Sequence, residues 1–165
     1  FNKIVITDGY ILANKTNQKI DQNIIPILKE LVEYKDKQAE VSFFTKDLNP
    51  ISNQPNHIKE KAKKAIRDLN RVFANYKMKF KIVSTGFDSR FSIDFHDRNI
   101  ATNFSLLDSG KGFNLLPYKE SNSQIISETI FEKYTYKRLN NIFRLQKKYT
   151  QQLNALETVE FKQYP

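Results

Sequence analysis

The chain has 165 residues, no cysteine and a formal net charge of +9. This length suffices for one domain with a buried core and is short for two. The absence of cysteine excludes disulfides and thiolate metal sites, and a total of two histidines argues against a multi-histidine metal centre. No run of about eighteen apolar residues occurs, so the sequence predicts no transmembrane helix.

The positive charge favours phosphate-rich partners, either nucleic acid or an anionic phospholipid surface. A basic composition that only keeps the protein in solution is an equally good explanation. The cysteine-free composition suits a cytoplasmic protein, with peripheral contact to a membrane left open, and no signal peptide is visible. Because the chain starts at Phe1 without a methionine, we expect a piece of a longer chain with other domains or partner proteins upstream.

The first part of the chain alternates predicted strands and helices. A β-branched run predicts a strand over 3–12, which the turn residues Asp8 and Gly9 interrupt. Apolar residues at helical spacing then predict a helix over 20–34. Pro26 should delay the start of its regular part or kink it.

The clearest helical pattern follows a predicted strand over 39–45 and a polar loop. Apolar residues recur at helical spacing from Ile58 to Tyr76, which predicts one packed face. The remaining positions are strongly basic, either as an ordinary solvated surface or as a surface that attracts phosphates. The basic residues assigned to this surface are Lys59, Lys63, Lys64, Arg67 and Arg71.

The second part of the chain predicts consecutive strands and a final helical region. The strands are expected over 79–85, 90–96, 99–107 and 113–116. Helical spacing returns over 124–157, where the apolar stripe indicates core or dimer contact more than base stacking. The order β-α-β-α-β-β-β-β-α predicts a single α/β domain with a mixed sheet covered by helices.

One stretch carries candidate chemistry. His96 and Arg98 stand two residues apart on a predicted extended segment, which puts both side chains on one face of the sheet. There, imidazole and guanidinium can converge on one phosphoryl group while a glycine-rich turn presents backbone N–H groups to its oxygens. The candidate phosphate-binding residues are His96, Arg98, Asn103, Gly110, Lys111, Gly112 and Asn114.

The pattern His96-x-Arg98, four residues, Asn103 and then a glycine turn resembles the phospholipase D superfamily signature. It is most similar to the C-terminal phospholipase D-like domain of eukaryotic MIT-domain proteins, which carries the same His-Asp-Arg, four residues, Asn variant. The resemblance covers residues 3–117 and implies a phospholipase D-like mixed β-sheet flanked by helices. In active members of the superfamily the histidine attacks phosphorus, a lysine stabilises the phosphoryl oxygens, and two half-sites make one active site.

Two departures from that signature argue against catalysis. Arg98 stands where active members have lysine, and Asn103 stands where they have an acid. The chain holds one half-site, so activity would require a dimer. The MIT-associated domain is described as a membrane-associated, non-catalytic module that dimerises, and the resemblance therefore implies a homodimer here as well.

We therefore expect a non-catalytic binding module that recognises phosphate on nucleic acid or anionic lipid and uses no cofactor or metal. Nucleic acid is favoured because no exposed amphipathic membrane anchor is visible. The first alternative is a homodimeric, metal-independent phosphodiesterase or nuclease in which His96 is the nucleophile. The second is a structural interaction domain, for example in a bacterial defence system.

Overall fold

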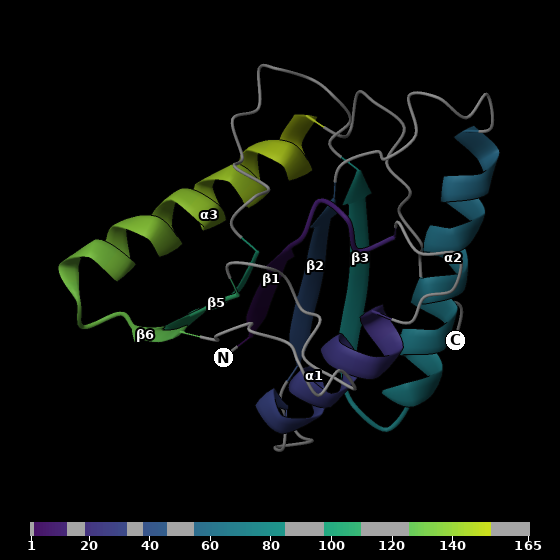
Figure 1. Cartoon of the computed structure of the whole chain (residues 1–165), viewed down its shortest axis with the longest axis horizontal. Helices are drawn as coiled ribbons and strands as arrows, with labels where there is room; N and C mark the ends of the chain where they lie inside the picture. The colour runs from purple at the N-terminus through teal and green to yellow at the C-terminus, as the bar shows by residue number, and fades with distance from the viewer. Residues whose placement is uncertain are drawn as a thin grey trace, which may run out of the picture.

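The described residues form a mixed α/β fold built on a six-stranded sheet (Figure 1). The computed structural model describes residues 2–12, 19–32, 38–45, 55–84, 98–109 and 126–152. In chain order the elements are β1 (Lys3–Thr7), a π-helical turn η1 (Ile20–Ile24), α1 (Ile25–Leu31), β2 (Ala39–Thr45), α2 (Pro55–Val72), β3 (Met78–Ser84), β4 (Asn99–Thr102), β5 (Ser105–Asp108), β6 (Ile126–Thr129) and α3 (Lys133–Gln152). The predicted α/β class is confirmed.

The sheet has the strand order β3-β2-β1-β4-β5-β6. β1, β2 and β3 run parallel, whereas β4 is antiparallel to β1 and the remaining neighbours are antiparallel as well. As a result, the carboxyl ends of β1, β2 and β3 share one edge of the sheet with the start of β4 and the end of β5. We call this edge the carboxyl edge, because open α/β sheets bind ligands at such an edge.

Helices cover both faces of the sheet (Figure 1). The alternation of β1 sends Ile4 and Ile6 into a core with α1 and α2, and sends Val5 into a second core with Leu139 of α3. α1 and α2 share a face because crossovers between parallel neighbours take one hand.

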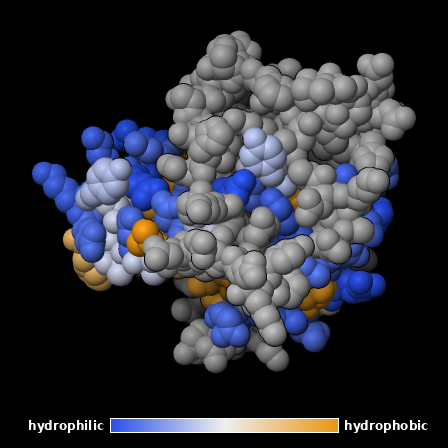
Figure 2. Space-filling model, viewed as in Figure 1, coloured by the Kyte–Doolittle hydropathy of each residue, from blue (hydrophilic) through white to orange (hydrophobic). Residues whose placement is uncertain are grey.

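The apolar stripe of α3 packs on the sheet. Leu139 is buried and Ile142 and Phe143 pack against the same core, while most side chains on the visible part of α3 are hydrophilic (Figure 2). Tyr134 and Tyr136 are exposed on this helix. For the described residues, this confirms the core interpretation of the stripe. It also removes that apolar face as a basis for the homodimer, which stays a prediction. None of the helices in the described ranges is long and apolar enough to cross a membrane.

The start of α1 follows the expectation for Pro26. The regular helix begins at Ile25 with Pro26 in its first turn, after the π-helical turn η1. Proline donates no backbone hydrogen bond, so it is tolerated in a first turn and not in a helix interior. The predicted late start of the regular helix is confirmed.

Two local predictions were wrong. The strand expected over 99–107 is a hairpin of β4 and β5, because the Thr102 hydroxyl accepts the backbone N–H groups of Phe104 and Ser105 and turns the chain. The helical region expected from residue 124 contains β6, which pairs with β5, and α3 begins only at Lys133. Pairing with a neighbouring strand overrides the spacing of a few apolar residues. The strands expected over 90–96 and 113–116 lie outside the described residues.

Candidate functional site

A buried carboxylate stands at the carboxyl edge, directly after β1. The Asp8 side chain is fully shielded from solvent. Its Oδ1 accepts the backbone N–H of Tyr10 at 2.8 Å, and its own N–H donates to the Phe44 carbonyl at 3.0 Å. This local bond makes an Asx turn, which explains why the strand ends here. A buried carboxylate is costly unless cations or donors compensate it.

Two cations face Asp8, one from the following segment and one from a distant part of the chain. Lys19 Nζ lies 4.0 Å from Asp8 Oδ2, and Arg98 Nε lies 3.7 Å from Asp8 Oδ1. Both distances exceed direct hydrogen-bond length, and Asp8 Oδ2 accepts no hydrogen bond from the described residues. Within the described part of the chain, one carboxylate therefore faces two positive charges. We call these three residues the Asp8 cluster.

The two cations of the Asp8 cluster are held differently. The Arg98 guanidinium carbon lies 5.6 Å from the centroid of the Tyr10 ring, in a cation–π contact. Burial lowers the pKa of Lys19 below its ordinary value, Asp8 opposes this effect, and Arg98 adds to it. The charged form of Lys19 thus lacks full compensation in the folded protein. A further anion at this place would supply it.

Ser109, the residue after β5, lies beside Arg98. The backbone N–H of Ser109 donates to the Arg98 carbonyl at 2.9 Å, which extends the pairing of β4 and β5 by one residue. Ser109 directly precedes the glycine-rich segment that begins at Gly110. The candidate residues His96, Gly110, Lys111, Gly112 and Asn114 themselves lie outside the described residues.

Asn103 does not join Arg98, which corrects its assignment to the same phosphate site. Its Oδ1 accepts the backbone N–H groups of Asn2 and Lys3 at 3.0 and 3.1 Å. Arg98 precedes β4 and Asn103 follows it, so about 16 Å of extended chain separates them. Asn103 therefore fixes the start of β1 at the opposite edge of the sheet.

Some basic residues on the surface of α2 form ion pairs within the helix, and others are exposed. Lys63 pairs with Glu60 at 2.8 Å and Arg71 with Asp68 at 3.7 Å, each one helical turn apart. Lys64 and Arg67 are exposed. The side chain of Lys59 lies outside the described residues. The helix packs its apolar face into the core, as predicted.

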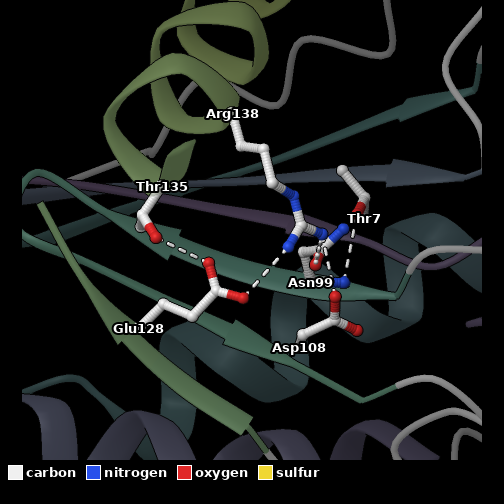
Figure 3. Close-up of polar contacts among 6 residues, drawn as sticks. All are labelled: Thr7, Asn99, Asp108, Glu128, Thr135 and Arg138. Carbon is white, nitrogen blue, oxygen red and sulfur yellow. Dashed lines mark hydrogen bonds and ion pairs between the residues drawn. The ribbon is translucent and has the colours of Figure 1, made fainter. Parts of the chain in front are cut away.

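A second charged cluster lies on the other face of the sheet, under α3 (Figure 3). Arg138 donates to Asp108 at 2.8 Å and to Glu128 at 3.3 Å, and the Thr135 hydroxyl donates to Glu128 at 2.7 Å. Burial by itself would lower the pKa of Arg138, but the hydrogen bond and charge of Asp108 and the charge of Glu128 raise it. We call these residues the Arg138 cluster. It joins α3 to β5 and β6.

Reasoning from the sequence missed Lys19, and it interpreted Asp8 as ordinary turn chemistry. A signal was present for Asp8, because an acid directly after a buried strand often lies at a ligand-binding edge. Nothing in the spacing of Lys19 connects it with Asp8 or Arg98, since only the fold brings the three together.

Comparison with known proteins gives no family for this chain. No protein-family model matches the sequence, and no curated protein matches it. Within the described ranges, no three histidine, aspartate or glutamate side chains are grouped closely enough to hold a metal ion. The charged clusters are therefore the features of this chain that bear on its function.

Proposed function

We propose that this chain is a phosphate-recognising module that holds the backbone phosphates of nucleic acid without cleaving them. The observation that carries the proposal is the convergence of Arg98 and Lys19 on a single buried carboxylate at the carboxyl edge. Arginine binds phosphate through a planar fork of donors, and lysine adds a point charge. A phosphate oxygen between them supplies the compensation that Lys19 lacks.

Chain connectivity supports a role for the rest of the motif. His96 is two residues from Arg98, and Gly110 follows Ser109, whose N–H bonds the Arg98 carbonyl. Both residues are thus close in sequence to the described residues of this edge, and on that ground we assign them to the site. In the proposal, the His96 imidazole and the N–H groups of Gly110–Gly112 complete the site in a phospholipase D-like arrangement.

The packing of the helices favours nucleic acid over lipid. α1, α2 and α3 place apolar residues against the sheet, so these faces are not available for lying in a membrane interface. The exposed Lys64 and Arg67 of α2 instead add long-range attraction for a polyanion. This attraction should weaken as salt rises.

The chemistry of the Asp8 cluster supports binding without turnover. A guanidinium keeps its proton at physiological pH, so Arg98 is a poor general acid for a leaving group. Asp8, the acid in the cluster, is buried and already accepts a backbone hydrogen bond. In the proposal, the ligand phosphodiester therefore stays intact.

Fluorescence anisotropy with a labelled single-stranded oligonucleotide tests the proposal. We expect Arg98→Ala to weaken binding about tenfold or more, the scale for losing a charge-assisted hydrogen bond. Lys77→Ala is the matched control, because it removes an exposed cation just before β3, at the opposite edge. It should change the affinity by less than about twofold. Arg98→Lys keeps the charge beside Asp8 and should bind with intermediate affinity.

Three outcomes would overturn the proposal. Equal losses of oligonucleotide affinity in Arg98→Ala and Lys77→Ala would mean that binding depends on overall positive charge and not on a specific site. Flotation of the protein with anionic vesicles, lost in Arg98→Ala while oligonucleotide binding is absent, would assign the site to lipid. Metal-independent cleavage that disappears in His96→Ala would make the protein a nuclease.

A further inference from the structure

A cavity lies between α3 and the amino ends of β1 and β2, at the edge opposite the Asp8 cluster. Its volume is about 730 Å³, within the range of small-molecule sites. The sheet contributes Lys3 and Glu40 to its lining, and the turn after β4 contributes Asn103. The α3 residues that line it are Asn140, Phe143, Arg144, Gln146 and Lys147.

Cations dominate the rim of this cavity. Lys3, Arg144 and Lys147 line it and form no ion pair with a described residue, and Glu40 is the carboxylate among the lining residues. The Ser42 hydroxyl donates to Glu40 at 3.5 Å and accepts from Gln146 at 3.1 Å. This chain of contacts holds Glu40 and Gln146 against the sheet. The three cations therefore leave the cavity with a positive balance.

Amide side chains and one aromatic ring supply the rest of the lining. Asn103 uses its Oδ1 on the backbone of β1, which leaves its Nδ2 donors for a ligand. Asn140 forms no hydrogen bond or ion pair with a described residue, and Phe143 is partly buried beside the core. Asn140 and Phe143 stand with Arg144 and Lys147 at helical spacing, so α3 presents all four along one face.

We propose that this cavity binds a nucleoside phosphate, either a free nucleotide or one unit of a single strand. Asparagine and glutamine amides match the donor and acceptor edge of a nucleobase, and an aromatic face stacks on a base. Arginine and lysine at the rim bind the phosphate. The cavity is separate from the Asp8 cluster and stands at the opposite edge of the sheet. The inference therefore goes beyond the proposed function and does not depend on it.

NMR titration of the protein with adenosine monophosphate and with a short oligodeoxyadenylate tests the inference. We expect both to shift the side-chain amide signals of Asn103 and Asn140. The charge-removing pair Arg144→Gln/Lys147→Gln should weaken binding about tenfold or more. Lys133→Gln/Lys137→Gln is the matched control, because it removes the same charge from exposed positions of α3 outside the cavity. It should change the affinity by less than about twofold.

Titration of Arg98→Ala separates the cavity from the proposed function. Adenosine monophosphate should shift the Asn103 and Asn140 signals equally in this variant and in the wild type. Shifts by the oligonucleotide alone would support the inference with a strand as the source. Absence of shifts with both ligands, equal effects of the two charge-removing pairs, or identical shifts with inorganic phosphate alone would overturn it.

Discussion

The Asp8 cluster and the Arg138 cluster differ in their ratio of cations to carboxylates and in the distances between the charged groups. In the Arg138 cluster one cation meets two carboxylates through direct hydrogen bonds of 2.8 and 3.3 Å. In the Asp8 cluster one carboxylate meets two cations at 3.7 and 4.0 Å, without a direct hydrogen bond. The clusters lie on opposite faces of β1 and β4, which present Thr7 and Asn99 to one and Asp8 and Arg98 to the other.

This difference indicates a structural role for one cluster and a binding role for the other. The Arg138 guanidinium donates hydrogen bonds to carboxylates of β5 and β6, so this cluster joins α3 to the sheet. Among the described residues, the Asp8 cluster has two cations and one acid, and their charged atoms lie 3.7 and 4.0 Å apart without a direct hydrogen bond between them. An added anion can therefore still be attracted by Lys19, whose pKa is lowered chiefly by burial. Loss of a residue should therefore affect stability in the first cluster, and both stability and anion binding in the second.

The largest effect is expected for Arg138→Leu. The change leaves Asp108 and Glu128 close together without their cation, and breaking a largely buried pair in this way costs about 3 kcal/mol. Urea denaturation measures the loss in the free energy of unfolding. Arg144→Leu removes an exposed cation from the same helix and should cost less than about 0.5 kcal/mol. Equal costs would refute the structural role of the Arg138 cluster.

Asp8→Asn should lower the free energy of unfolding by about 2 kcal/mol, because it removes the buried carboxylate that faces Lys19 and Arg98. The amide oxygen still accepts the Tyr10 N–H, which keeps the turn. Inorganic phosphate at constant ionic strength should then raise the melting temperature more than in the wild type. Asp108→Asn is the control, and phosphate should raise its melting temperature no more than that of the wild type. A gain shared by both variants would contradict a binding role specific to the Asp8 cluster.

The pH dependence of binding should depend on Lys19. Its pKa in the folded protein is lowered, chiefly by burial, so between that pKa and 10.5 the unfolded chain binds more protons. The free energy of unfolding should rise with pH in this window, while affinity for an oligodeoxyadenylate should fall as Lys19 loses its charge. Lys19→Met should bind more weakly at neutral pH and lose both slopes. Unchanged slopes in this variant would exclude Lys19 from the site.

The smallest effect on stability is expected at Asp21, an exposed acid with which the effects in the two charged clusters can be compared. Burial raises its pKa first, Asp68 raises it further, and Lys64 and Arg71 oppose the shift. The folded state thus disfavours the carboxylate, and stability falls as pH rises from 3.8 through the folded pKa. Asp21→Asn should remove this loss and stabilise the protein by about 0.3 kcal/mol at neutral pH, since solvent screens the site. Thermal melts at pH 4 and 7 measure it, and destabilisation at pH 7 would contradict the assignment.

Sequence patterns predicted the elements whose signal is local. The strand over 39–45 and the parallel strand that follows α2 were recognised from β-branched and apolar runs, and Pro26 was placed at the start of its helix. α2 was recognised because its apolar residues repeat at one period over five turns. These features depend on neighbours within a few residues, so the sequence alone determined them.

The tertiary structure decided which residues share a site. Asp8 and Arg98 are ninety residues apart and meet because β4 lies antiparallel beside β1, and Lys19 joins them where η1 begins. β4 also separates Arg98 from Asn103. The two residues are only five positions apart in the sequence, and the sequence motif had placed them in one site. β6 forms because β5 offers it a pairing partner. Strand register and direction are long-range choices, and no local pattern encodes them.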